Sequence, residues 1–287
     1  ATQLAGGIGL IYTGLTALWA IMLSLAGMNM FDAVTHAMTT LATGGYSTRT
    51  ASIGAFDSVI IEWIIIFGMI VGSLPFAHYL ALTRGGWRSL MNDPQVRLFL
   101  ILVAGLIILL SWHLTQTGQG FGNAFRQSSF NAVSIMTGTG YVSANYSAWG
   151  GFASTVLLMT MFIGGCGGST TCGIKVFRLQ VLAATARVQI SRLLRPHAVV
   201  LAYYNRRPVI PEVMDSVMGF FYLYIIGFVV IAILLGMMGL DFVTALSGAA
   251  TSISNVGPGL GVVIGADGNF SPLPDSAKWV MSFGMLL

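Results

Sequence analysis

The sequence predicts an all-α integral membrane protein built from repeated units of helix, re-entrant half-helix and helix. Of its 287 residues, 55% are hydrophobic and only 8% are charged, and the mean hydropathy is +0.82. An ordinary soluble domain carries about 25% charged residues, whereas a hydrocarbon solvent nearly excludes them. In addition, three related glycine-rich passages follow three short apolar runs. Recurrence in the same context indicates an internal repeat.

The three passages align when Gly45, Gly140 and Gly257 are placed in register. They are Thr-Gly-Gly-Tyr-Ser at 43–47, Thr-Gly-Thr-Gly-Tyr at 137–141 and Asn-Val-Gly-Pro-Gly at 255–259. The apolar runs before them, 31–42, 125–136 and 242–254, are rich in small and hydroxyl residues. Each run is shorter than the ~20 residues that a bilayer crossing needs. We therefore expect half-helices that enter the membrane and stop at the glycines.

The remaining apolar runs predict the full crossings. The first extends from Ile8 to Ala26 and suffices for one span. Later runs at 59–82, 98–114 and 213–238 each predict another crossing, and 277–287 predicts the start of a last one. Between 152–163 and 174–188 lies a loop with five glycines in ten residues, Gly164 to Gly173, which interrupts a long helix.

Single acidic residues in these elements have simple expected roles. Asp32 and Asp241 stand where side chains cap helix N-termini. Glu62 is expected to lie solvated at the membrane interface.

Charge placement tests whether the short runs cross. The basic clusters 84–97 and 175–207 are both expected to be cytoplasmic by the positive-inside rule. Three apolar segments separate them, so the clusters share a side only if the middle one, 125–136, returns to the face that it entered. Non-helical backbone at membrane depth is tolerated where it lines water or is buried in protein. Three such loops around one axis predict a central pore.

The residue types predict a pore for a monovalent cation. Glycine lets backbone carbonyl oxygens approach an axis that side chains would crowd, and carbonyl oxygens can replace the hydration shell of potassium. A half-helix that runs inward directs its C-terminus, with about −0.5 charge, at the loop. No carboxylate lies within the three passages.

Three other interpretations of these residues exist. The glycines can be ordinary turn residues between spans, but this does not explain their threefold recurrence. A secondary transporter with broken helices usually carries an ionisable residue at the break, and these breaks hold only Gly and hydroxyl residues. A Ser169–Lys175 catalytic dyad lacks any supporting pattern for an oxyanion site.

These passages resemble the membrane subunit of Trk-type bacterial potassium uptake systems, within the wider Trk/Ktr/HKT group. The resemblance rests on Phe31-Asp32-Ala33, on the three passages, on Asn255 to Gly261 and on the loop from Gly164 to Thr170 with Lys175. It implies a potassium filter of backbone carbonyls at Thr43, Gly44, Gly45, Gly138, Thr139, Gly140, Asn255, Val256 and Gly257. The transported ion would be K⁺, with no organic cofactor.

The family arranges four such units around one pore, and this chain shows three. The units expected here are 1–92, 93–207 and 208–287, similar to the second, third and fourth of the family. We therefore expect a fragment that lacks the first unit and the end of the last one.

The resemblance also implies a gate and partners. The gate would consist of Gly164, Gly165, Cys166, Gly167, Gly168, Ser169, Thr170 and Lys175. A passive kink is the alternative for this loop, and Cys166 and Cys172 are expected to be small packing residues. The family pairs with a cytosolic nucleotide-binding regulatory subunit of the RCK type and forms a homodimer in the bacterial inner membrane. The basic stretch 187–207 would then contact that subunit or anionic lipid; no nucleic-acid partner is expected.

Overall fold

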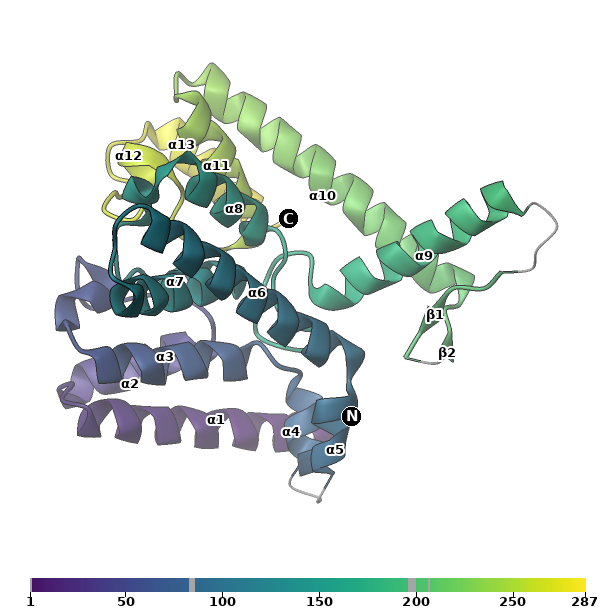
Figure 1. Ribbon diagram of the computed structural model, residues 1–287, viewed down its shortest axis with the longest axis horizontal. Coiled ribbons are helices and arrows are strands. Elements are labelled where there is room, and N and C mark those ends of the chain that lie inside the picture. Colours follow the sequence, from purple (N-terminus) through teal and green to yellow (C-terminus); the bar gives the residue numbers. More distant parts are fainter. Residues whose placement is uncertain (1, 83–85, 196–199, 206) are drawn as a thin grey trace.

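Long helices open each of three units. The computed structural model describes residues 2–82, 86–195, 200–205 and 207–287. Within these residues, three straight helices are long and apolar enough to cross a bilayer (Figure 1). They are α1 (Thr2–Leu25), α6 (Pro94–Gln116) and α10 (Pro211–Met237). Prolines at the first turns of α6 and α10 fit because that position needs no N–H partner.

A shorter helix follows each long one, as the sequence predicts. These half-helices are α2 (Met30–Leu41), α7 (Phe121–Met136) and α11 (Phe242–Ser254), and each packs against the long helix before it. The second starts four residues earlier than the apolar run, at Phe121, because a first turn that contains Gly122 and Asn123 interrupts the apolar pattern. α7 and α11 end directly before their glycine-rich passages, and α2 ends one residue earlier, before Ala42.

Side-chain caps start two of the half-helices. The Asp241 carboxylate accepts a hydrogen bond from the backbone N–H of Thr244, as expected. The cap predicted at Asp32 is wrong: Asn29 caps α2, accepting from the N–H of Asp32. The buried carboxylate of Asp32 instead accepts bonds from Thr48 and Arg49, both at 2.6 Å. It thereby ties the segment after the first passage to α2.

The third helix of the first unit is broken, which corrects the prediction of one span over 59–82. α3 (Val59–Gly72) and α4 (Phe76–Leu82) meet at 94°. Pro75 explains the break, because it lacks an N–H and disfavours helical geometry in the residue before it. The Tyr79 hydroxyl donates to the Val71 carbonyl at 2.7 Å and so satisfies a group that the break exposes.

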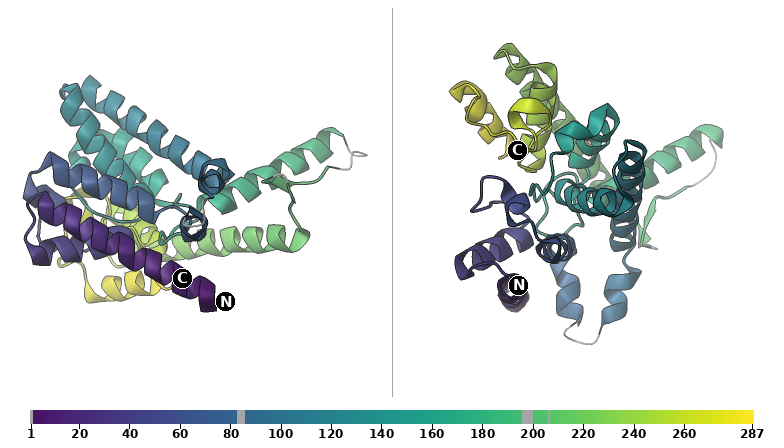
Figure 2. Two further views of the ribbon diagram at one scale, coloured as in Figure 1. Left: turned by 90° about the horizontal axis from the view of Figure 1, so that it is seen from below. Right: turned by 60° about the vertical axis from the view of Figure 1, so that its left-hand side comes forward.

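The other units are completed by α8 (Gly150–Met161) and α13 (Asp275–Gly284). α3 packs on α7 of the second unit, and α8 packs on α11 of the third. Figure 2 shows the first and third units on either side of the second. Short connecting elements are η1 (Ser52–Phe56), α5 (Trp87–Asn92), η2 (Tyr146–Trp149) and α12 (Gly261–Ile264).

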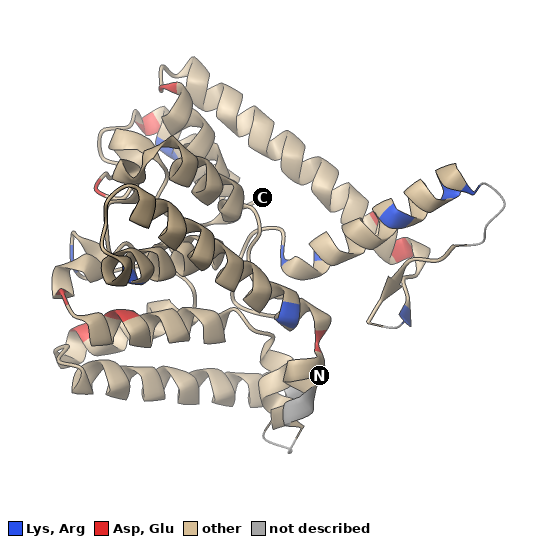
Figure 3. Ribbon diagram, in the orientation of Figure 1, with Lys and Arg blue, Asp and Glu red and all other residues tan. Residues whose placement is uncertain are grey.

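An arm extends from this body at one end. It consists of α9 (Val176–Leu194), a hairpin of two short strands, β1 (Tyr203–Tyr204) and β2 (Arg207–Pro208), and the start of α10 (Figure 1). Arg187 and Arg192 lie in α9, and Arg195 directly follows its last residue. Figure 3 shows basic residues along this arm. Arg206, part of the predicted basic stretch, lies outside the described residues.

Candidate functional site

The three glycine-rich passages share positive φ angles at equivalent positions. We call residues 43–45, 138–140 and 255–257 loops A, B and C. Their first residues all have positive φ, as do their third residues. The φ values are +50°, +69° and +52° for Thr43, Gly138 and Asn255, and +66°, +80° and +105° for Gly45, Gly140 and Gly257. Since L-residues with side chains rarely adopt this region, the repeat seen in the sequence is a repeat of backbone shape.

Each half-helix ends in the same hydrogen-bond pattern. The N–H groups of Gly44, Thr139 and Val256 donate to the carbonyl oxygens five residues earlier, at 2.8, 2.9 and 3.0 Å. This bond is the hallmark of the Schellman motif, in which a left-handed residue reverses the chain. The negative end of each helix dipole therefore lies at its loop.

A hydroxyl residue six positions before each third-position glycine was not singled out by the sequence analysis. Thr39 donates to the Tyr46 carbonyl at 3.0 Å, and Ser134 donates to the Tyr141 carbonyl at 2.7 Å. Thr251 has the same place, but its buried hydroxyl has no partner among the described residues. The spacing was available as a signal in the sequence, yet it becomes meaningful only after the register is known.

Neighbouring loops touch through their glycines. A Cβ added to Gly45 would lie 1.7 Å from the Thr139 carbonyl oxygen, and one added to Gly140 would lie 1.9 Å from the Val256 oxygen. The third residue of each loop thus contacts the middle residue of the next loop. For Gly257, the nearest atom to an added Cβ is the Gly140 Cα at 3.8 Å. The nine predicted filter residues therefore gather in one arc, A to B to C.

Loop B is braced on both sides. Tyr141 is fully buried, and its hydroxyl contacts the Thr39 hydroxyl and donates to the His36 carbonyl at 3.3 Å. Tyr146 is also buried and donates to the Gly259 carbonyl at 3.2 Å. In contrast Tyr46, which has the place of Tyr141 in the first passage, is 79% exposed.

The 164–173 loop, predicted as the gate, lies against loop A and α3. The Thr170 hydroxyl lies 3.0 Å from the carbonyl oxygens of both Leu41 and Gly72, and the Thr43 hydroxyl donates to it at 3.2 Å. This contact connects the second unit to the end of α2 and to the first residue of loop A.

The bend between α3 and α4 receives the same loop. Cys166 N–H donates to the Ser73 carbonyl, and Phe76 N–H donates to the Gly168 carbonyl, both at 3.0 Å. Gly164 and Gly168 have φ of +71° and +79°, so the loop uses left-handed backbone that glycine allows. The broken helix thus forms the seat of the loop.

The other gate candidates differ in their surroundings. Ser169 donates to the Cys166 carbonyl at 2.6 Å, and Gly165 N–H donates to the Thr171 hydroxyl at 3.1 Å. Lys175, with φ +69°, lines a separate cavity of about 520 Å³ beside Gly167.

The two cysteines are both free. Cys166 is buried, as expected for a packing residue, but Cys172 is exposed, which corrects the expectation for that residue.

Two polar contacts at helix ends were missed or misjudged. The Gln95 side chain accepts a hydrogen bond from Gly167 N–H at 2.9 Å, and nothing in the sequence pointed to this contact. Glu62 is not solvated at the interface: its side chain is only 5% exposed and lies 3.3 Å from Arg126 of α7. A buried carboxylate in an apolar helix needs such a partner, and α7 supplies it.

The comparison with protein families decides what kind of chain this is. The family model described as "Cation transport protein", TrkH, matches residues 4–287. The chain belongs to the TrkH family.

Curated TrkH-family relatives agree with this assignment. One is the Trk system potassium uptake protein TrkI of Halomonas elongata, 43% identical over 279 residues, with 96% of this chain and 56% of that protein covered. Another is TrkH of Escherichia coli K12, 35% identical over 292 residues, with coverages of 99% and 59%. The chain thus spans less than 60% of the length of these relatives.

A solved structure of a TrkH-family member has the same fold. The crystal structure of the potassium transporter TrkH from Vibrio parahaemolyticus matches with a TM-score of 0.91 and 34% identity, over 99% of this chain and 61% of that one. The predicted all-α membrane architecture is confirmed. The three relatives are named as potassium transport proteins rather than enzymes, in line with the rejection of the Ser169–Lys175 dyad.

Proposed function

We propose that this chain forms most of a pore for potassium uptake, with loops A, B and C supplying backbone carbonyls to the ion. The observation that carries the proposal is the shared positive φ at the first and third residues of three loops that touch in sequence. Three helix C-termini direct partial negative charge at them, and no carboxylate lies within them. That combination suits a monovalent cation that exchanges water for carbonyl oxygens. The names of the relatives favour K⁺.

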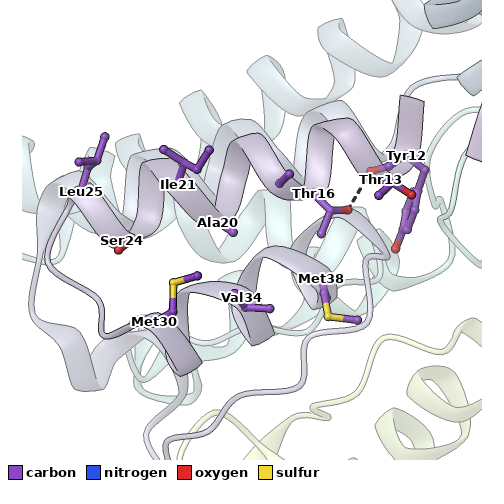
Figure 4. Close-up of a pocket in the computed structure, with 11 residues that line it drawn as sticks. Tyr12, Thr13, Thr16, Ala20, Ile21, Ser24, Leu25, Met30, Val34 and Met38 are labelled. Atoms are coloured by element: carbon purple, nitrogen blue, oxygen red, sulfur yellow. Dashed lines mark hydrogen bonds between the residues drawn. The ribbon is translucent and has the colours of Figure 1, made fainter. Parts of the chain in front are cut away.

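We further propose that a fourth unit closes the ring against α1 and α2. The internal repeat supports this. Val133 of α7 is buried in a cluster with α3, and Ala250 of α11 is buried in one with α8. Met38, in the same register on α2, is 53% exposed. It lines an apolar groove of about 630 Å³ between α1 and α2, with Ala20 and Val34 (Figure 4). In the proposed ring, a helix of the fourth unit would fill this groove and pack on α2 as α3 packs on α7.

We propose that the chain is divided into units 1–92, 93–207 and 208–287. Within the second of these units, we assign the role of gate to the 164–173 loop. Its hydrogen bonds to the end of α2 place any movement of the loop next to loop A. The arm of α9, the hairpin and the start of α10 is the surface that we propose for a cytosolic nucleotide-binding regulator. Its arginines face the cytoplasm by the positive-inside rule. A homodimer in the bacterial inner membrane completes this proposal.

The decisive experiment measures rubidium uptake into proteoliposomes that contain the full-length protein. Uptake should be inhibited strongly by external potassium and weakly by sodium. Equal inhibition by the two ions would overturn the assignment of potassium. Absence of flux from correctly inserted protein, with and without its cytosolic regulator, would overturn the pore itself.

A further inference from the structure

A chain of hydrogen bonds links the cytoplasmic surface to the 164–173 loop. Ser89 of α5 donates to Nδ1 of His78, and Nε2 of His78 lies 2.7 Å from Oδ2 of Asp93. The side-chain amide of Gln95 donates to the same Oδ2 at 3.3 Å. The Gln95 Oε1 then accepts the N–H of Gly167 at 2.9 Å. Three elements, α4, α5 and α6, and the loop are thereby connected through side chains.

The chemistry of the groups determines the direction of each bond. A carboxylate only accepts, so the hydrogen between His78 and Asp93 is carried by Nε2. In neutral His78, Nδ1 then accepts from the Ser89 hydroxyl. Protonation would place a hydrogen on Nδ1 as well and would turn the contact with Asp93 into a charge-assisted bond, about twice as strong as a neutral one.

One carboxylate oxygen serves two donors, and this sharing is the basis of the inference. Oδ2 of Asp93 accepts from His78 at 2.7 Å and from Gln95 at 3.3 Å, so the Gln95 bond is already the longer one. A cationic imidazole competes better for that oxygen and so weakens the hydrogen bond from the Gln95 side-chain amide to it. The backbone N–H of Gln95 stays bound to the other oxygen, Oδ1, at 2.8 Å, so the helix start is kept while the side chain is loosened.

We propose that Gln95 is a positioning residue that latches the 164–173 loop, and that protonation of His78 from the cytoplasm releases this latch. The inference rests on the proposed role of that loop as the gate. Acidification of the cytoplasmic side then increases basal flux. The His78 side chain is 20% exposed and lines a polar cavity of about 330 Å³ with Asn205 of the hairpin, so protons reach it from solution.

Other titratable and charged groups lie near these hydrogen-bonded residues. The Arg97 guanidinium is engaged with the Met91 carbonyl and the Asn92 side chain. Burial, together with the charge of Asp93, raises the pKa of Tyr204 to about 12, so this phenol stays neutral near pH 7. The charge of Asp93 also acts on the buried Cys166 thiol. Arg84 and the side chain of Arg88 lie outside the described residues. Histidine is the side chain that ordinarily changes charge between about pH 5 and 8.

The test uses the full-length protein and two readouts. Hydrogen exchange of the peptide containing Gly167, expressed as a protection factor, reports the latch, and rubidium uptake reports the gate. Between pH 8 and pH 6 on the cytoplasmic side, we expect protection to fall and flux to rise about fivefold, the scale set by loss of one hydrogen bond.

Three variants separate the latch from general structure. His78→Gln keeps a donor to Asp93 without titrating, so both readouts should become independent of pH. Gln95→Leu should show low protection and high flux at every pH. Gln180→Leu is the matched control, because it removes a 2.9 Å bond from α9 to the Pro94 carbonyl at the same helix start and leaves Gly167 bound. It should preserve the pH response.

The outcomes distinguish this inference from the proposed function. Protection at Gly167 that does not change with pH, or that changes equally in His78→Gln, overturns the latch. Protection that changes as expected while flux stays constant supports the latch but overturns the gating role of the loop. Parallel changes of both in the parent protein and neither in His78→Gln support both.

Discussion

Replacing Gly140 by alanine should remove potassium selectivity and leave a folded protein. The added Cβ would lie 1.9 Å from the Val256 oxygen and 2.8 Å from Cδ of Pro258, whereas atoms in van der Waals contact lie about 3.5 Å apart. Loops B and C must therefore separate by roughly 1.5 Å at this point. In addition, the left-handed backbone costs a non-glycine residue about 1–2 kcal/mol.

The expected size of the effect follows from this strain. Each 1.4 kcal/mol corresponds to a tenfold change in an equilibrium ratio. If strain of that size falls on the potassium-bound form of the loops, the potassium-to-sodium flux ratio should decrease by about tenfold. The assay is rubidium uptake with sodium competition in proteoliposomes of the full-length protein, with thermal unfolding measured on the same samples.

Gly138→Asn is the matched control in the same loop. A Cβ at Gly138 would meet its nearest atoms only at 3.7 Å. The register equivalents Thr43 and Asn255 already have side chains with φ near +50°, and asparagine visits this region readily. Selectivity should therefore be retained. An unchanged flux ratio in Gly140→Ala, or an equal loss in Gly138→Asn, would refute the argument from loop contact.

Three further predictions follow from individual contacts. Thr170→Val should raise basal rubidium flux several-fold, because it removes the hydroxyl bonds that hold the 164–173 loop against the first unit. Ser169→Ala loses bonds only within the loop and should not raise the flux. Equal fluxes in the two variants would support the interpretation of the loop as a passive kink. Gly68→Ala should lower the melting temperature, since its Cβ would lie 2.4 Å from the indole nitrogen of buried Trp19. Gly105→Ala, whose Cβ would have nothing within 4 Å, should leave the melting temperature unchanged or raise it. Similar shifts in the two variants would contradict this packing. Hydrogen bonds from the hydroxyl and the backbone N–H of Thr244 lower the pKa of the Asp241 carboxyl, which caps α11. The ionised carboxyl therefore contributes to the free energy of unfolding at pH 7, and this contribution is lost as the pH falls below about 4. Asp241→Asn should reduce the dependence of the free energy of unfolding on pH in the acid range. An unchanged dependence would argue against the cap.

The repeat was predictable because it depends on local signals. Apolar length separates crossing helices from half-helices, and glycine in register marks the positions of left-handed backbone. The three loops follow from these two properties. The bend at Pro75 was visible in the same way, but the apolar run around it was continuous, and hydropathy outweighed the effect of one proline in the prediction.

Contacts between distant polar groups could not be predicted. Glu62 pairs with Arg126, and Gln95 pairs with Gly167, only because α3 packs on α7 and because the 164–173 loop enters the bend of the first unit. Neither spacing nor composition determines such partners. The cap at Asn29 was missed for a smaller reason: it lies three residues before Asp32, the cap that was predicted.

The seating of the 164–173 loop in the first unit has a consequence for biosynthesis. The carbonyl oxygens of Leu41 and Gly72 receive the Thr170 hydroxyl from 129 and 98 residues further along the chain. While the first unit leaves the translocon, these groups have no such partner, and an unsatisfied backbone group in hydrocarbon costs several kcal/mol. The nascent first unit must therefore keep water, or the insertion machinery, at the end of α2. We therefore expect release into lipid to wait until the second unit has been made, so that the two units mature together.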